Sequence, residues 1–212
     1  MKTLNYSTVT LNDIETLFNI EKNYNREKFK DWFLQKEPIP QNEKEILFKL
    51  ITKHRDKINY YTELELISKV IAPILNMVDF EIKEKHIRDF YETPLKYIYK
   101  DVLFNGRCDF VVAKGYDAPI KPYFFIQEFK QSSSSYPEEQ LLAEMIVATS
   151  INENNFIRGA YIIGSVWSFV ILEKHPNSSY TYFISKKYDS MENEDLEQIY
   201  HNLQFVKQEI SI

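Results

Sequence analysis

A block of β-type segments between residues 79 and 130, enclosed by two helical segments, constrains the fold of this chain more than any other feature. Helical periodicity covers residues 62–78 before the block and 137–152 after it. This order predicts an α/β (α+β) protein whose mixed central β-sheet is flanked by helices. The expected strands are residues 80–83, 97–104, 108–113, 123–130, 159–164, 168–172 and 180–185, and a last helix is expected over residues 192–209.

Local signals predict where several of these elements begin and turn. Thr62 is a suitable N-cap for the first helix, with Glu65 as its capping-box partner, and Pro73 predicts a kink in that helix. Asn105-Gly106 is a typical hairpin turn and predicts a turn between two of the strands. The serines at 132–135 predict a loop.

The first 59 residues predict a helical extension that precedes a core of residues 60–212. Leu11, Ile14, Leu17 and Phe18 recur at helical spacing. Later in this segment the pattern resumes after Pro40, and we expect these helices to pack against the core.

Composition excludes several classes of protein. Only four glycines occur, and neither glycine-rich phosphate-binding motif is present. The single cysteine, Cys108, excludes an intrachain disulfide and a zinc–cysteine cluster. Because no long apolar run and no signal-like N-terminus occurs, we expect a soluble, cytoplasmic protein that does not associate with a membrane. The net charge of −5 counts against strong general binding of nucleic acid, although a local basic patch would be enough.

The strand expected over residues 123–130 ends in two charged residues. Side chains alternate between faces along a strand, so Glu128 and Lys130 share a face with Phe124 and Ile126. A charge at a core position is costly unless it is paired or bound to a metal. The end of this strand is therefore a candidate site.

Asp109 is the second candidate acid. It is expected to share an inward face with Val111, while Cys108 and Phe110 point the other way. If the two strands pair, Asp109 and Glu128 converge, and a Mg²⁺ or Mn²⁺ ion could bind between them. Such an ion could activate water, which a lysine beside it could orient. The alternative is an ordinary salt bridge between one of these acids and a nearby cation.

The helix before the strands contributes one more acid, and a basic run follows it. Glu63 lies on the stripe of Ile67 and Val70 that faces the core, whereas Glu65 is the better capping residue. The basic run is Lys83, Lys85, His86 and Arg88, and it is either a solvated face or a phosphate-contacting patch flanking the site.

The order helix, strands, Asp, Glu-x-Lys, helix and strand resembles the core of the PD-(D/E)XK nuclease superfamily. Residues 106–115, 122–130, 140–145 and 161–169 resemble a group of largely uncharacterised bacterial proteins of that superfamily. The likeness extends in detail over residues 60–185. It implies a restriction-endonuclease-like αβββαβ core.

The resemblance also implies an activity, namely metal-dependent hydrolysis of DNA phosphodiester bonds. Asp109 and Glu128 would bind Mg²⁺ (or Mn²⁺), Lys130 would assist the attacking water, and Glu63 would be an accessory acid. Gln140 would be a further polar residue near the site. Residue 144 is Glu, where related nucleases often have Tyr.

Two functions of different class remain open at this stage. One is a Mg²⁺-dependent nuclease that acts on DNA, with a homodimer as a hypothesis because cutting both strands generally requires two sites. The other is a non-catalytic module of the same fold that binds nucleic acid or a protein partner, since a fold does not determine a function.

Overall fold

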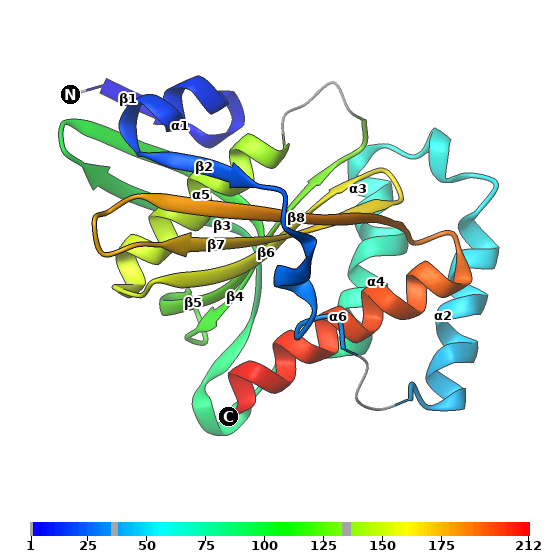
Figure 1. Cartoon of the computed structure of the whole chain (residues 1–212). Coiled ribbons are helices and arrows are strands. Elements are labelled where there is room, and N and C mark those ends of the chain that lie inside the picture. Colours follow the sequence, from blue (N-terminus) through cyan, green and yellow to red (C-terminus); the bar gives the residue numbers. More distant parts are fainter. Residues whose placement is uncertain (1, 35–37, 133–136) are drawn as a thin grey trace.

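The computed structural model describes residues 2–34, 38–132 and 137–212. Within these ranges the protein is a mixed α/β structure built on an eight-stranded sheet (Figure 1). The strands are β1 Lys2–Asn5, β2 Ile20–Asn23, β3 Ile87–Tyr99, β4 Val102–Lys114, β5 Ile120–Lys130, β6 Phe156–Ile163, β7 Val166–Lys174 and β8 Tyr180–Asp189. The α-helices are α1 Leu11–Leu17, α2 Gln41–His54, α3 Glu63–Leu66, α4 Ala72–Val78, α5 Pro137–Asn152 and α6 Asn193–Ser211. The serine-rich loop expected at 132–135 lies, except for Ser132, outside the described residues.

The sheet combines parallel and antiparallel pairs in the order β1-β4-β5-β6-β7-β8-β2, with β3 paired to β4. β5 and β6 are parallel, and α5 connects them across one face of the sheet. The pairs β3–β4, β4–β5, β6–β7 and β7–β8 are antiparallel. The expectation of a mixed central sheet flanked by helices is therefore confirmed.

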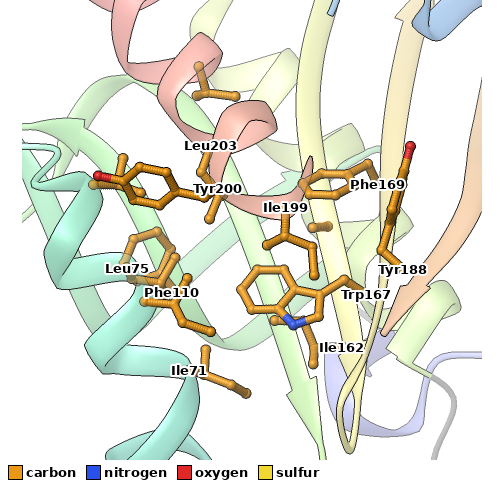
Figure 2. Packing of buried hydrophobic residues seen from close by; sticks show 14 of the residues in the cluster. Ile71, Leu75, Phe110, Ile162, Trp167, Phe169, Tyr188, Ile199, Tyr200 and Leu203 are labelled. Carbon is orange, nitrogen blue, oxygen red and sulfur yellow. The ribbon is translucent and has the colours of Figure 1, made fainter. Parts of the chain in front are cut away.

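Two hydrophobic layers enclose the sheet. On one face, α4 and α6 pack over aromatic residues that include Phe110, Trp167 and Phe169, as Figure 2 shows. On the other face lies α5, whose residues 141–148 are all fully buried. A helix that is apolar all round must be covered on every side. Residues of the N-terminal segment, among them Tyr6 and Ile14, complete that cover because they pack in the same cluster as α5.

The N-terminal segment differs from the helical extension expected over residues 1–59. α1 and α2 are helices, but the segment also contains two short strands that join the sheet. β1 pairs with β4, and β2 pairs with β8. The helical description is therefore wrong for residues 2–5 and 20–23, because backbone pairing with strands far along the chain determines their structure.

The hairpin turn expected at Asn105-Gly106 is also wrong. β4 continues through both residues, and the chain turns instead at Lys100, which has a φ of 51°. Gly106 is needed for a close contact, because a Cβ at this position would lie 2.5 Å from Cδ2 of Tyr6. The glycine therefore permits packing of the N-terminal segment on the sheet rather than a turn.

The strand expected over residues 80–83 is absent from this part of the chain. Ile82 forms only an isolated bridge with Ile87, and a 3₁₀ turn covers Lys83–Lys85. The helix before it is confirmed, with a reciprocal capping box between Thr62 and Glu65.

Pro73 predicts a kink in this helix, and the structure has a π-helical segment, Ile67–Ile71, between α3 and α4, just before this proline. The Ala72 N–H donates to the Ile67 carbonyl. Because proline has no N–H to continue the α-helical pattern, a local change of helix type just before it is expected.

Candidate active site

Asp109 and Glu128 meet where β4 and β5 separate. The paired register of these strands ends at Phe110 and Gln127. Beyond that point, hydrogen bonds from backbone N–H groups to the two carboxylates take the place of the backbone hydrogen bonds between the strands. Phe129 N–H donates to Oδ2 of Asp109 at 2.7 Å, and Asp109 N–H donates to Oε1 of Glu128 at 3.4 Å. The two acids are thus held at the fork between the strands, as the sequence predicts.

The faces expected around Asp109 are only partly correct. Phe110 lies in the layer beneath α4 and α6, but Cys108 packs with Val111 in the layer beneath α5. Regular alternation would put Cys108 and Phe110 on the same face. The facing residue on β3, Glu92, has a φ of 49°, so the pair of strands is irregular at this level. The irregularity allows Asp109 to turn toward β5.

Lys130 is the centre of the charge arrangement. Its Nζ lies 3.5 Å from Oδ2 of Asp109, 3.6 Å from Oε2 of Glu128 and 3.9 Å from Oε1 of Glu63. Glu128 is completely buried, whereas 45% of the Glu63 side chain is exposed. Burial disfavours the charged lysine, but the carboxylates of Glu128, Asp109 and Glu63 outweigh it and raise the pKa of Lys130. The ammonium group of Lys130 is therefore surrounded by three acids, which come from α3, β4 and β5.

An open cleft of about 800 Å³ exposes this arrangement. Glu63, Asp109, Lys130 and Gln140 all line it, so the structure brings the predicted accessory residues to the same cleft. Glu128 lies behind them. The remaining wall consists of Arg107, Gly106 and residues 7–10 of the N-terminal segment. Glu63 and Arg107 are the more exposed side chains of this cleft, and Asp109 and Lys130 lie deeper in it.

Sequence reasoning did not identify Glu144 as a site residue, although it is the most unusual group in the site. It is completely buried, and neither carboxyl oxygen has a hydrogen-bond partner among the described residues. Burial raises its pKa to about 8, and its neighbours are Glu128, Cys108 and Gln140. Its spacing from Gln140, one helical turn, is the signal that could have indicated it.

Glu128 and Glu144 form a buried pair of carboxyl groups. Burial is the largest cause that raises the pKa of Glu128 well above its usual value, followed by the charges of Glu144 and Asp109. Two adjacent buried carboxylates are costly when both are ionised. The pair therefore retains a proton into the neutral pH range, and Lys130 opposes this only in part.

Replacing Glu144 with Gln should alter how stability depends on pH. Below about pH 4.5 the carboxyl is neutral in both the folded and the unfolded chain, so it adds no pH-dependent cost. As pH rises toward 8, the unfolded chain gains by releasing the proton that the folded chain retains. Glu144→Gln should therefore gain stability over the wild type with rising pH, by roughly 1–4 kcal/mol at pH 8.

Urea unfolding at pH 4.5, 6 and 8, followed by circular dichroism, would measure this difference. Glu139→Gln, on the same helix, is the matched control and should show no such trend. A Glu144→Gln curve parallel to that of the wild type at all three pH values would contradict the raised pKa.

The fork fits a divalent metal ion in its donor chemistry. Oε2 of Glu128 is buried without a hydrogen-bond partner among the described residues, and carboxylate oxygens are the ligands that Mg²⁺ prefers. Within the same residues, no three His, Cys, Asp or Glu side chains form a group that could hold a metal. An ion here would therefore need backbone oxygens or water as well, which Mg²⁺ readily accepts.

No protein-family model matches this chain, and a search of curated proteins found no match either. In the described part of the chain, no helix is long and apolar enough to cross a membrane. The chemistry of the cleft is thus the basis for any functional conclusion.

Proposed function

We propose that this protein is a metal-dependent nuclease that hydrolyses DNA phosphodiester bonds in the cleft at the fork of β4 and β5. The observation that supports the proposal best is the position of Lys130, whose ammonium lies within 3.9 Å of Asp109, Glu128 and Glu63 at an open cleft. An ion pair with a purely structural role needs only one acid and no cleft.

The order of elements also supports the proposed relationship to the PD-(D/E)XK nucleases. The π-interrupted helix of α3 and α4 is followed by β3, β4, β5, α5 and β6, which is the order of the αβββαβ core. Asp109 lies on the middle strand of the three, Glu128 and Lys130 end the last one, and Gln140 belongs to the helix that follows.

Asp109 and Glu128 are the residues that would hold Mg²⁺ or Mn²⁺. When bound, such an ion would polarise a phosphoryl oxygen and lower the pKa of a coordinated water. The chain's own groups divide the remaining work. Phe129 N–H fixes the Asp109 carboxylate, Lys130 supplies positive charge beside the position of the phosphate, and Glu63 is the exposed acid that can accept a proton from water.

A cleavage assay tests the proposal. Wild-type protein should cut plasmid or single-stranded DNA in Mg²⁺ or Mn²⁺ and lose this activity in a chelator. Asp109→Asn retains an oxygen that can accept the Phe129 hydrogen bond but removes the charge, so metal affinity and cleavage should both fall, by about 100-fold for cleavage. Asp117→Asn, in the exposed loop between β4 and β5, is the matched control and should behave as wild type.

Calorimetric titration with Mg²⁺ or Mn²⁺ separates the two functional classes. Metal binding together with cleavage supports the enzyme. Neither metal binding nor cleavage by the wild type would contradict it and favour a non-catalytic module that binds nucleic acid or protein. Metal binding without cleavage of DNA would reject this substrate while leaving the metal site in place.

A further inference from the structure

A second cleft, of about 780 Å³, lies at the other end of β5. It is lined by residues at the beginning of this strand, including Phe124, whereas Lys130 ends the same strand. Six residues of an extended strand separate the two by about 20 Å, at roughly 3.3 Å per residue. A volume of this size is typical of sites for small molecules. The cleft is therefore distinct from the candidate active site.

The rim of this cleft is basic. Lys85 and His86 belong to the basic run identified in the sequence, and Lys114 ends β4. The charged lining residues are Lys85, Lys114 and Arg158, opposed by Glu84 and Glu209, so cations outnumber carboxylates. Two of the four residues of the basic run, Lys85 and His86, line this cleft, and none of the four lines the candidate active site.

Arg158 gives this cleft a preorganised polar base. Its guanidinium is held between rings, with Cζ 4.5 Å from the centroid of Phe156 and 5.0 Å from that of Trp32, and 11% of its side chain is exposed. Nη2 lies 3.0 Å from Oε1 of Glu209. Nε and Nη1 are buried without a hydrogen-bond partner among the described residues, as is Oδ1 of Asn154.

Unpaired buried polar groups are costly, and their presence together at a cleft indicates a molecule that supplies partners. The donors of Arg158 and the acceptor of Asn154 call for a ligand that has both acceptors and donors. Phe124 and Phe156 add aromatic surface for a flat ring.

We propose that this second cleft binds a small phosphorylated molecule with a planar ring, of the nucleoside monophosphate class. Lys85 and Lys114 contact the phosphate, the ring packs on Phe124 and Phe156, and the polar edge of the ring meets Asn154 and Arg158. A phosphate monoester carries up to two negative charges and suits several cations better than a single carboxylate does. The site does not depend on the proposed nuclease activity, because it shares no lining residue with the first cleft.

Calorimetric titration with AMP and UMP, in the absence of divalent metal, tests the proposal. At least one of them should bind, and Lys85→Ala/Lys114→Ala should weaken binding roughly tenfold, a change worth 1.4 kcal/mol. Lys130→Met should bind normally, because that residue lines the other cleft. Lys96→Ala/Lys100→Ala, on β3 and the turn that follows it, is the matched control and should also bind normally. Circular dichroism confirms that each variant is folded.

Adenosine and inorganic phosphate serve as partial ligands, and each should bind more weakly than AMP. No binding of AMP or UMP at millimolar concentration would overturn the proposal. Equal affinity in wild type and Lys85→Ala/Lys114→Ala would overturn it too, as would binding that is lost in Lys130→Met. Phe124→Ala provides a second test that leaves every charge intact, and it should weaken AMP without affecting inorganic phosphate.

Discussion

Lys130→Met should reduce phosphodiester cleavage by about 100- to 1,000-fold while leaving the protein folded and able to bind metal. Methionine retains the length and apolar stem of lysine but removes the ammonium from the centre of Asp109, Glu128 and Glu63. The loss should appear in the rate of cleavage under saturating substrate. Divalent metal affinity should stay the same or increase, since the competing cation is gone.

This division of effects distinguishes a catalytic lysine from a structural one. If Lys130 only neutralised buried acids, its removal would lower stability and metal specificity without affecting cleavage in the folded fraction. Lys121→Met is the matched control, because Lys121 also lies on β5 and pairs with an acid, Glu153, at 3.1 Å, but far along the strand from the fork. Cleavage by Lys130→Met at the wild-type rate would exclude a role for the ammonium in the reaction.

Lys130→Arg is a useful companion variant. It retains the positive charge, but its wider planar guanidinium prefers bidentate contacts with carboxylates. Compared with Lys130→Met, we expect Lys130→Arg to recover more of the folding stability than of the cleavage rate. A full recovery of cleavage would indicate that charge alone, and not the position of one ammonium, is what the site requires.

The candidate site could be predicted because its chemistry is encoded locally. Glu128 and Lys130 interrupt the end of an apolar strand, and alternation along that strand fixes their common face. Glu63 could be predicted from the helical stripe it shares with Ile67, although it is the most exposed acid at Lys130. In each case a charged residue occupies a position where the local pattern calls for an apolar one.

Glu144 could not be recognised in the same way, because the property that makes it unusual is the burial of its carboxyl group in the folded protein. In the sequence it is a single acid within the apolar run of residues 141–148, one helical turn after Gln140, but an acid in a helix is usually solvated. In the structure α5 has no polar face at this level, since the N-terminal segment covers it, so the carboxyl is enclosed beside Glu128. The burial of Glu144 can be predicted only when both the helix and the N-terminal segment that covers it are known.

The errors in the fold have the same origin. Asn105-Gly106 satisfies a local turn pattern, but a contact with Tyr6, about 100 residues earlier, determines the role of Gly106. β1 and β2 are four residues long, too short for a period-two pattern to be distinguished from chance, and partners distant in sequence make them strands. Long elements with long apolar runs, such as α5 and β5, were predictable from local pattern alone.

The division into residues 1–59 and 60–212 leads to the second large expected effect. Trp32→Ala should destabilise the whole protein by about 3–5 kcal/mol, in the range for removal of a large buried aromatic residue. Trp32 is buried against Phe125 and Phe169 of the sheet, with ring centroids 6.5 and 5.3 Å away. Its Nε1–H donates to the Asn202 carbonyl of α6 at 2.8 Å. The residue thus joins the N-terminal segment to both the sheet and the last helix.

Urea unfolding followed by far-ultraviolet circular dichroism measures this effect without depending on tryptophan fluorescence. A single transition at lower urea concentration would show that the first 59 residues unfold together with the core. Tyr24→Ala, in the same segment but 82% exposed, is the matched control and should change stability by no more than about 0.5 kcal/mol. Two separate transitions, with only the first shifted by Trp32→Ala, would instead establish the N-terminal segment as a unit that folds by itself. Since residues 7–10 of that segment line the candidate active-site cleft, a single transition would also mean that the proposed cleavage activity and global stability are lost together in this variant.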